Sequence, residues 1–261
     1  VIINSLPITT KTLNLKVDGK NLIGNSPKVE RGTTVQLCAS CNGKGADVYI
    51  YIGESVGNNN PTYSQKKAEY KKIGSSWYYV VDLDANTIGT YDIYFTASKD
   101  GYSVTSSHKK LTVTKAATPA SAITAPAANA LTYNGAEQAL VTAGKTTGGT
   151  MLYRLGDSKW SEQLPTAINA GEYTVWYKVQ GNAEYADVAE QSLPVTVAKK
   201  AVTVTALDQS AYTGSTAPDL SSPEADKDYK VEGLVGADTL SGTVTLDYAQ
   251  TPDMSKTGKT A

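Results

Sequence analysis

Short stretches in which apolar and polar residues alternate follow one another along this chain, separated by turns rich in glycine, proline and asparagine. In the clearest stretch, 47–52, the side chains of Val48, Ile50 and Ile52 share one face and tyrosines occupy the other. The same reasoning predicts strands at 12–17, 33–39, 47–52, 77–83, 91–97 and 109–114. The pattern predicts an all-β fold of antiparallel strands.

One pattern occurs twice. Gly89-Thr-Tyr-Asp-Ile-Tyr-Phe95 and Gly171-Glu-Tyr-Thr-Val-Trp-Tyr177 each begin at a glycine and continue as a strand of alternating β-branched and aromatic residues. The two glycines lie 82 residues apart (171 − 89), which is about the length of one small sandwich domain. The repeat therefore predicts tandem antiparallel β-sandwich modules.

The tyrosine just inside each of these strands has a structural interpretation. Tyr91 and Tyr173 occupy the position of a tyrosine corner, in which the phenol hydroxyl bonds back to the backbone shortly before the strand. Both residues are therefore expected to stabilise the fold and to take no part in a reaction.

The length of 261 residues and the repeat predict three modules, at 1–115, 116–199 and 200–261. The first contains a long polar insert, 54–67, which we interpret as a mobile spacer, with a binding loop as the alternative. Almost no linker separates the second and third modules, so an elongated rod is expected. The next Gly-x-Tyr turn is due near residue 253. Gly258 is followed by Thr260 where the tyrosine should stand, so the last module is predicted to be truncated and to expose a sheet edge.

Composition and charge narrow the classes of partner. Seventeen tyrosines accompany a single phenylalanine, and tyrosine suits half-buried strands and wet surfaces. The formal net charge is −1 without a basic block, so no nucleic-acid partner is expected. No apolar run approaches the roughly 20 residues of a membrane span, and no signal-peptide pattern is found from Val1 onward.

The cysteines form one Cys38-Ala-Ser-Cys41 motif at the end of a predicted strand. A zinc site needs about four nitrogen or sulfur ligands, and a redox motif needs to open a helix, so neither chemistry fits well. We favour a structural use, which leaves open a local disulfide between Cys38 and Cys41 or two free thiols.

No catalytic constellation is found. His108 is the only histidine, and it is expected on the solvated surface because no orienting partner for a general base is evident. Gly258-Lys259-Thr260 lacks the earlier glycine of a phosphate-binding loop. The stretch from Asp82 to Asn86 begins like a calcium loop but lacks its later glycine and glutamate, which leaves only a surface calcium site open. We therefore expect no enzyme activity, no cofactor and no metal.

Aromatic residues offer one candidate binding surface. Trp176 and either Trp77 or Tyr78 are expected to be core or half-buried residues. Trp160, beside a predicted hairpin, is the better candidate for stacking on a sugar, together with the outer tyrosine faces.

Several motifs resemble a known family. Leu131-Thr-Tyr-Asn-Gly, Gly148-Gly-Thr-Met-Leu-Tyr and Asn169-Ala-Gly-Glu-Tyr look like the bacterial immunoglobulin-like repeats of Gram-positive cell-surface proteins. Tyr212-Thr-Gly, Tyr229-Lys-Val-Glu-Gly-Leu and Asp238-Thr-Leu-Ser-Gly242 resemble the MBG-type domains found with them. The resemblance extends from about residue 123 to residue 247 and is looser over the first module. It implies β-sandwich modules without catalytic residues.

These observations favour a non-catalytic spacer segment of an extracellular, cell-surface or secreted protein. Its partners would be other domains of the same protein. Two alternatives remain: an adhesive module that binds a host glycan or protein, and an accessory region of a secreted carbohydrate-active enzyme.

Overall fold

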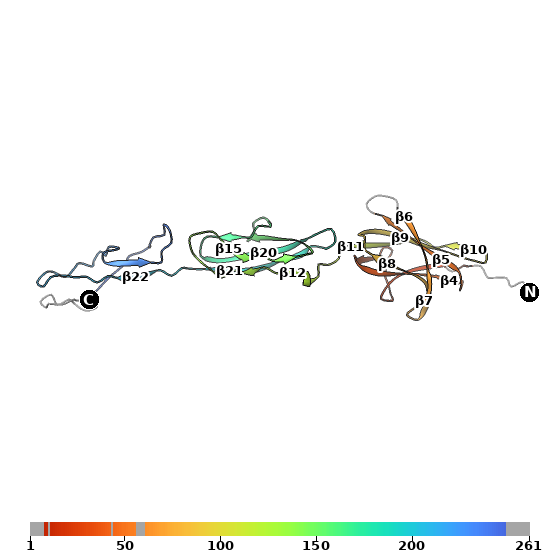
Figure 1. Cartoon of the computed structure of the whole chain (residues 1–261), viewed down its shortest axis with the longest axis horizontal. Coiled ribbons are helices and arrows are strands. Elements are labelled where there is room, and N and C mark those ends of the chain that lie inside the picture. The colour runs from red at the N-terminus through yellow and green to blue at the C-terminus, as the bar shows by residue number, and fades with distance from the viewer. Residues whose placement is uncertain (1–7, 10, 43, 56–60, 249–261) are drawn as a thin grey trace, which may run out of the picture. The chain divides into compact units, whose positions relative to one another are not determined.

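A computed structural model describes residues 8–9, 11–42, 44–55 and 61–248 (Figure 1). The described part is built from β-strands, with one short 3-10 helix, η1 (Ala120–Ala122). The predicted all-β sandwich fold is confirmed. Within the described residues, no helix has the length and hydropathy needed to cross a membrane.

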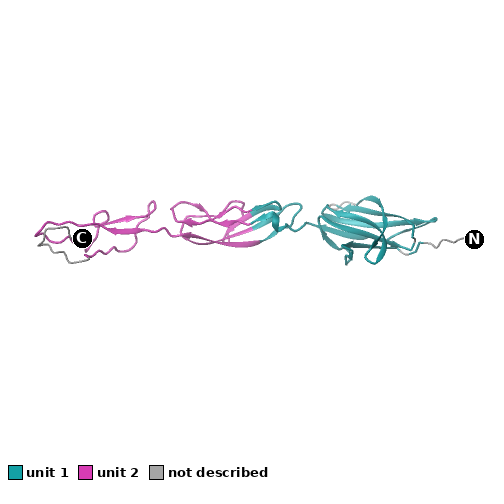
Figure 2. Ribbon diagram, turned by 60° about the horizontal axis from the view of Figure 1, so that its bottom comes forward, with its two compact units in different colours: residues 1–124, 145–151, 178–189 teal, residues 125–144, 152–177, 190–261 magenta. Residues whose placement is uncertain are grey.

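The contacts divide the chain into two compact units (Figure 2). Unit 1 comprises Val1–Thr124, Lys145–Met151 and Lys178–Ala189, and unit 2 comprises Ala125–Gly144, Leu152–Tyr177 and Glu190–Ala261. The predicted module borders at 115 and 199 follow the repeat, whereas this division follows contacts, so the borders stay a prediction.

Unit 1 contains a complete sandwich of two sheets. The first sheet has the order β2 (Lys20–Asn21), β1 (Lys11–Val17), β4 (Thr33–Cys41), β8 (Ser76–Ala85), β7 (Glu69–Ile73). The second has the order β3 (Lys28–Glu30), β11 (Lys109–Thr114), β9 (Gly89–Lys99), β5 (Asp47–Ser55), β6 (Thr62–Lys67), and β10 (Tyr102–Thr105) also pairs with β9. Neighbouring strands are antiparallel except β3 and β11, which are parallel. This division of strands between two sheets is that of an immunoglobulin-like sandwich.

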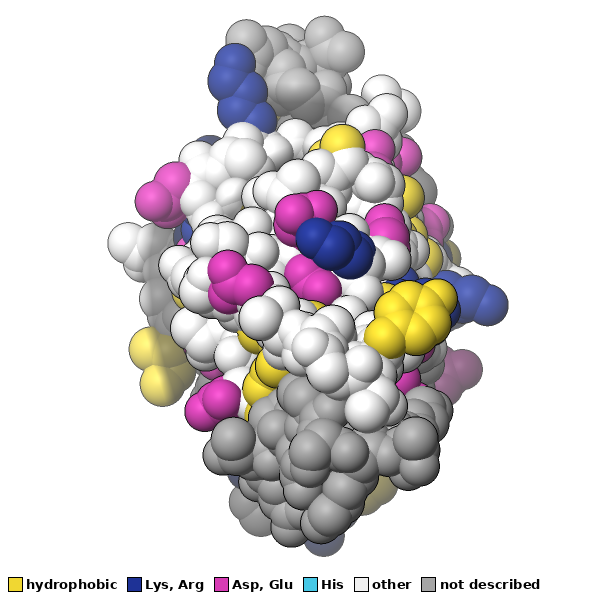
Figure 3. Space-filling model, turned by 90° about the vertical axis from the view of Figure 1, so that its left-hand side faces the viewer, with side chains coloured by type: hydrophobic (Ala, Val, Ile, Leu, Met, Phe, Trp, Pro, Cys, Tyr) yellow, Lys and Arg dark blue, Asp and Glu magenta, His cyan; other side chains and the backbone are white. Residues whose placement is uncertain are grey.

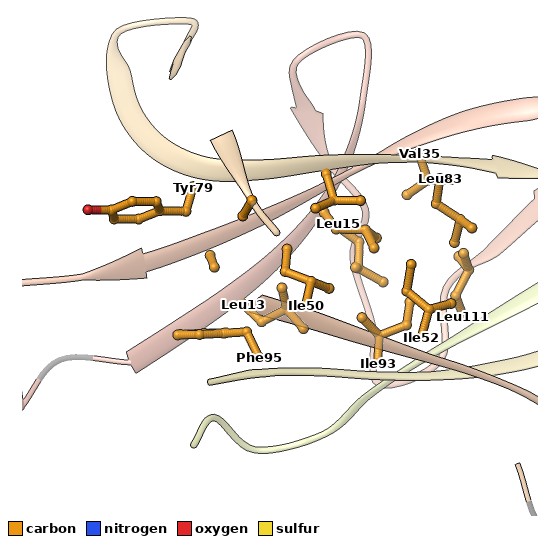
Figure 4. Close-up of a cluster of buried hydrophobic side chains, with 14 of the residues drawn as sticks. Leu13, Leu15, Val35, Ile50, Ile52, Tyr79, Leu83, Ile93, Phe95 and Leu111 are labelled. Atoms are coloured by element: carbon orange, nitrogen blue, oxygen red, sulfur yellow. The ribbon is translucent and has the colours of Figure 1, made fainter. Parts of the chain in front are cut away.

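The core lies between these two sheets, because each strand turns every second side chain inward. Figure 4 shows side chains of β1, β4 and β8 facing those of β5, β9 and β11. Phe95, Ile50 and Ile93 are fully buried from the second sheet, and Val35 and Leu37 from the first. All six strands predicted for this module are present, within a few residues of their predicted ends.

The polar insert is a different matter. Residues 62–67 and 69–73 form β6 and β7, the outer strands of the two sheets, so the interpretation of 54–67 as a mobile spacer is wrong for its described part. Every residue of β6 is exposed. A strand that is exposed to solvent on both faces does not alternate between apolar and polar residues. The hydrophobic pattern therefore did not reveal it. Residues 56–60 lie outside the described residues.

The repeated glycines have a conformational reason. Gly89 and Gly171 have φ angles of 154° and 159°. A Cβ atom at Gly89 would lie 2.9 Å from the carbonyl oxygen of Ser55 on the neighbouring strand. Glycine thus allows β9 to begin close against β5.

The second repeat centres on a four-stranded sheet of order β14 (Leu131–Thr132), β21 (Val188–Ala198), β20 (Gly171–Gly181), β18 (Gly149–Leu155). Short antiparallel pairs accompany it: β12 (Ile123–Thr124) with β17 (Lys145–Thr146), β13 (Ala127–Ala128) with β16 (Val141–Thr142), and β15 (Gln138–Ala139) with β19 (Thr166–Ala167). Its buried apolar residues include Leu140, Val175, Val179, Val195 and Val197.

Beyond residue 200, regular structure is sparse. β22 (Thr203–Ala206) pairs with β23 (Tyr229–Glu232), and this pair forms a separate two-stranded sheet. Gly258, Thr260 and the expected turn near residue 253 lie outside the described residues.

Candidate functional site

A row of stacked rings crosses the outer face of the second sheet of unit 1. Tyr51 on β5 stands directly opposite Tyr94 on β9, and their rings stack with centroids 4.7 Å apart and planes 2° apart. The tyrosines face outward because the neighbouring residues Ile50, Ile93 and Phe95 point into the core.

His108 extends this row by one ring. The register of β11 with β9 pairs Lys109 with Ile93, which places the preceding residue, His108, beside Tyr94. The imidazole stacks on the Tyr94 ring with centroids 4.5 Å apart and planes 24° apart. Three strands or strand ends thus contribute one continuous row of rings.

Asp92 orients the imidazole. Oδ2 of Asp92 lies 2.6 Å from Nδ1 of His108, and the hydroxyl of Tyr63 on β6 donates a hydrogen bond to the same oxygen. The expectation that His108 lacks an orienting partner is therefore wrong, although its side chain is 52% exposed and does lie at the surface. We name Tyr51, Tyr63, Asp92, Tyr94 and His108 the aromatic–acid cluster.

The cluster alters the acidity of two of its members. The hydrogen bond to the Asp92 carboxylate is the main cause that raises the pKa of Tyr63 to about 12. For Asp92, burial favours the neutral acid, but hydrogen bonds from Tyr63 and His108 outweigh it, so the pKa of Asp92 is lowered. Asp92 is accordingly a carboxylate that accepts two hydrogen bonds at neutral pH.

The Tyr63 hydroxyl and the His108 imidazole are not arranged as a nucleophile and its base. Both groups bond to the Asp92 carboxylate, so the Tyr63 hydroxyl does not bond to the imidazole. A phenol whose pKa is near 12 is also a poor nucleophile at neutral pH. Among the described residues, no three His, Cys, Asp or Glu side chains gather as a metal site would require.

The acidic stretch at 82–86 has other partners. Asp82 forms an ion pair with Lys71 at 3.1 Å, and Asp84 accepts a hydrogen bond from the Thr34 hydroxyl at 2.7 Å. Both carboxylates lie on the outer face of β8, where they contact side chains of the neighbouring strands β7 and β4.

Tyr91 and Tyr173 form the bonds that define a tyrosine corner. The hydroxyl of Tyr91 donates to the carbonyl of Thr87 at 3.1 Å, and that of Tyr173 donates to the carbonyl of Asn169 at 2.8 Å. In both cases the acceptor lies four residues before the tyrosine, so the bond fixes the turn that enters β9 or β20.

Cys38 and Cys41 are free thiols, and no disulfide joins them. Both lie on the extended strand β4, where three residues span about 10 Å, whereas a disulfide needs Cα atoms about 4.4–6.8 Å apart. Burial raises the pKa of the Cys38 thiol to about 11, although Lys16 acts in the opposite direction. Cys38 is therefore a protonated, unreactive thiol at neutral pH.

Trp160 is half-buried, and it takes part in a cation–π cluster. The guanidinium carbon of Arg154 lies 4.9 Å from the ring centroid of Trp160 and 5.2 Å from that of Trp176. Arg154 also pairs with Glu190 at 3.4 Å and with Asp157 at 3.6 Å. A sugar stacking on Trp160 would have to use a ring face that Arg154 leaves open.

The other aromatic residues divide between the interior and the surface. Trp176 and Tyr78 are half-buried, whereas Trp77 is 54% exposed and stacks on Tyr70 with centroids 5.2 Å apart.

The sequence indicated the tyrosine corners because their bonds are local. It did not indicate the aromatic–acid cluster, because its members come from β5, β6, β9 and the start of β11 and meet only through the pairing register. The one available signal was the placement of tyrosines at 49, 51, 63 and 94, which marks outward positions without indicating their neighbours.

No family model and no curated protein matches this chain. Among solved structures, the fibronectin(III)-like modules of Clostridium thermocellum CbhA are similar at 13% sequence identity, covering 73% of this chain and 95% of that chain with a TM-score of 0.25. A likeness at this score supports no inference about how the present chain acts.

Proposed function

We propose that this chain is a non-catalytic spacer segment of a bacterial cell-surface or secreted protein, and that its β-sandwich modules position other domains of that protein. The proposal rests on one observation: hydrogen bonds, an ion pair and close packing fix the segments that connect the predicted modules. It also agrees with the resemblance to bacterial immunoglobulin-like and MBG-type repeats, which implies an extracellular location.

The first connection lies wholly within unit 1. The backbone N–H of Ala116 donates to the carbonyl of Glu184 at 3.0 Å, and that of Ala186 donates to the carbonyl of Ala116 at 2.8 Å. Arg31, at the end of β3, forms an ion pair with Glu184 at 2.9 Å. The segment that leaves β11 is thus bonded to the 182–187 loop of the second repeat, whereas a free linker would leave neighbouring domains to move independently.

The second connection lies wholly within unit 2. The hydroxyl of Tyr133 donates to Asp238 at 3.1 Å. Val235 lies so close to Gly135 that a Cβ atom there would approach its Cγ1 to 2.7 Å. Lys199 and Lys200, at the border between the second and third predicted modules, line a cavity of about 230 Å³ next to these contacts.

Small-angle scattering of the full chain tests the spacer role. Domains held end to end give a pair-distance distribution with a long tail, and the tail should change when a short Gly-Ser segment is inserted between Lys115 and Ala116. A compact globular profile for the natural chain would contradict the proposal.

A second candidate function is adhesion to a glycan or protein, and the aromatic–acid cluster favours it. The cluster presents a half-exposed imidazole and an exposed phenol on a rigid sheet, which are groups that hydrogen-bond and pack against a ligand. A glycan array and a binding screen with extracellular host proteins would test it, using His108→Ala for the cluster and Trp160→Ala for the second repeat. No binding by the natural chain, or binding that both variants retain in full, would count against adhesion.

An accessory region of a secreted carbohydrate-active enzyme is the third possibility. It makes the same structural demands as a spacer, and the sequence of the parent protein around this segment would distinguish the two.

A further inference from the structure

The most exposed tryptophan of this chain lies on the β7–β8 hairpin. All three tryptophans fall within the described residues, and Trp77 is 54% exposed, whereas Trp160 and Trp176 are half-buried. The sequence favours Trp160 for stacking on a sugar, but the guanidinium carbon of Arg154 lies 4.9 Å from its ring centroid. Trp77 therefore offers more open ring surface than Trp160.

Trp77 is the outermost of three aromatic side chains that lie in contact. The register of the hairpin places Tyr70 opposite Tyr79. It also places Lys72 opposite Trp77, so these side chains project from one face of the hairpin. Tyr79 is 5% exposed and lies at one end of the core of unit 1 (Figure 4). The Tyr70 ring packs against that of Tyr79 at 4.8 Å and stacks on that of Trp77 at 5.2 Å, with the latter planes 17° apart. We name Tyr70, Trp77 and Tyr79 the aromatic ladder.

The aromatic ladder holds the Trp77 ring in place and leaves part of it open. The Tyr79 hydroxyl accepts a hydrogen bond from the backbone N–H of Ala46 at 2.9 Å, which fixes the inner end of the ladder. Tyr70 covers one face of the indole, so an exposure of 54% leaves much of the opposite face and the ring edges in water. A ring that is already ordered loses little conformational entropy when a ligand binds.

Exposed apolar side chains that stand alone are common on soluble proteins. On the face shown in Figure 3, for example, hydrophobic side chains appear in small separate areas among acidic and uncharged groups. Trp77 and Tyr70 differ because both are exposed and their rings are stacked. Such a pair presents open ring surface that is fixed in position, which an isolated side chain does not.

The size of this surface decides what kind of ligand can use it. At 54% and 41% exposure, Trp77 and Tyr70 together offer on the order of 200 Å² of ring surface. A stable protein interface needs roughly 800 Å² on each partner. Along the hairpin, the exposed residues next to the rings are polar: Glu69, Lys72, Ser75 and Ser76. The surface is accordingly too small for a protein partner and suits a ligand of one or two rings.

We propose that Trp77 and Tyr70 bind a neutral pyranose sugar whose ring substituents are all equatorial, such as a β-linked glucose residue. Such a ring carries C–H groups on both faces, and these pack against the electron-rich face of the indole. Its hydroxyls point outward from the rim, where the ammonium of Lys72, opposite Trp77, can donate a hydrogen bond to one of them. Glu69 and Lys72 carry opposite charges, so the surroundings do not favour a charged sugar.

This site is independent of the spacer role, because the residues that connect the modules take no part in it. It also lies apart from the aromatic–acid cluster, since the ladder belongs to the first sheet of unit 1 and the cluster to the second. A ligand of one or two rings gains few contacts, so we expect a dissociation constant on the order of 1 mM. Binding this weak is lost on a washed glycan array and has to be measured at equilibrium.

Titration of the full chain with cellotetraose, followed by two-dimensional NMR, tests the proposal. We expect a saturable shift of the indole N–H signal of Trp77 and of the amide signals of β7 and the first half of β8. Sorbitol carries similar hydroxyls but has no ring face, and it should cause no saturable shift. p-Cresol, an analogue of the tyrosine side chain, should bind no more tightly than the sugar.

Matched variants locate the site. Trp77→Ala should abolish the shifts of the hairpin amides. Trp77→Tyr keeps a smaller ring and the packing of the hairpin, and it should weaken binding several-fold. Tyr212→Ala removes another aromatic ring, one that is 88% exposed, and should leave binding unchanged.

The proposal is overturned if the Trp77 signal shows no saturable shift at about 20 mM cellotetraose, a concentration well above the expected dissociation constant. An equal response to sorbitol, or undiminished binding by Trp77→Ala, would also overturn it. So would binding of p-cresol at Trp77 that is about tenfold tighter than that of the sugar, because an aromatic side chain of a protein would then be the better ligand.

Discussion

At the residue scale, single hydrogen bonds hold the turns that lead into the long strands. Tyr91 is almost completely buried, and its hydroxyl satisfies the carbonyl of Thr87. Tyr91→Phe keeps the ring but removes this bond, so we expect the module to lose about 1 kcal/mol. Native-state hydrogen exchange of β9 amides would measure the loss. Tyr102→Phe, at a position 46% exposed, is the control and should change nothing. Equal exchange in both variants would show that the corner bond does not stabilise the strand.

Asp92 makes the module sensitive to acid. Its folded pKa is lowered, so its contribution to stability is complete above the ordinary aspartate pKa of about 3.9 and is lost as pH falls through the lower, folded value. Asp92→Asn removes this contribution. We expect the variant to be less stable at neutral pH and to lose less stability on acidification, as measured by urea unfolding from about pH 7 to pH 2. If the stabilities of the natural protein and the variant fall equally with pH, Asp92 is not the source of the acid sensitivity.

The two tyrosine corners and the aromatic–acid cluster show why sequence reasoning succeeded at one site and failed at the other. A corner joins residues four apart, so the Gly-x-Tyr pattern contains both ends of its bond. Asp92 and His108 lie sixteen residues apart and meet only because Lys110 pairs with Asp92 across β11 and β9. Pairing register depends on the turn between the strands, which the alternation of residues does not specify.

At the element scale, the beginning of β9 depends on glycine in two ways. Gly89 has a φ of 154° and also lies against Ser55. Gly101 has a φ of 84°, and a Cβ atom there would meet nothing within 4 Å. Gly101→Ala should therefore cost only backbone strain, roughly 1–2 kcal/mol.

Gly89→Ala adds the contact with the Ser55 carbonyl, and we expect a larger loss than at Gly101, on the order of 2–4 kcal/mol. Urea unfolding of the two variants measures the difference. A smaller loss at Gly89 than at Gly101 would mean that β5 moves aside without cost.

The strands predicted correctly and those missed differ in burial. β5 and β9 bury every second side chain, and their alternation is plain in the sequence. β6 buries nothing, and β7 only partly covers two of its residues, Lys71 and Ile73. Edge strands of this kind are held by backbone pairing with β5 and β8 and by cross-strand side-chain pairs such as Lys67 with Asp47. Polar composition there indicates an edge as readily as a loop.

At the scale of the whole molecule, the 82-residue spacing of the two glycines indicated repeated sandwiches, because each repeat needs its own penultimate strand. The spacing said nothing about how one repeat is attached to the next. Those attachments rest on the pairs Arg31–Glu184 and Tyr133–Asp238, and the repeat pattern does not indicate that these residues meet. The partner of each connecting side chain lies in another part of the chain, so the local sequence pattern does not contain it.

The Arg31–Glu184 pair is the clearest test of whether an attachment restricts motion within unit 1. Both side chains are partly exposed, at 30% and 51%, so the pair should add little to unfolding free energy, about 1 kcal/mol or less. Its effect should appear instead in the orientation of residues 182–187 relative to the first sandwich. Residual dipolar couplings of the first sandwich and of residues 182–187 should fit one alignment tensor in the natural chain and two in Arg31→Glu.

The double variant Arg31→Glu with Glu184→Arg restores opposite charges and should restore a single tensor. Lys67→Glu breaks an ion pair with Asp47 elsewhere on the same sandwich and should leave the couplings unchanged. If Arg31→Glu also leaves them unchanged, the connection is held without the ion pair, by the backbone bonds of Ala116 and by the Thr118 hydroxyl, which donates to the carbonyl of Ala186 at 3.2 Å. Rigidity would then depend on the length of the 115–118 segment, and an insertion there should release it.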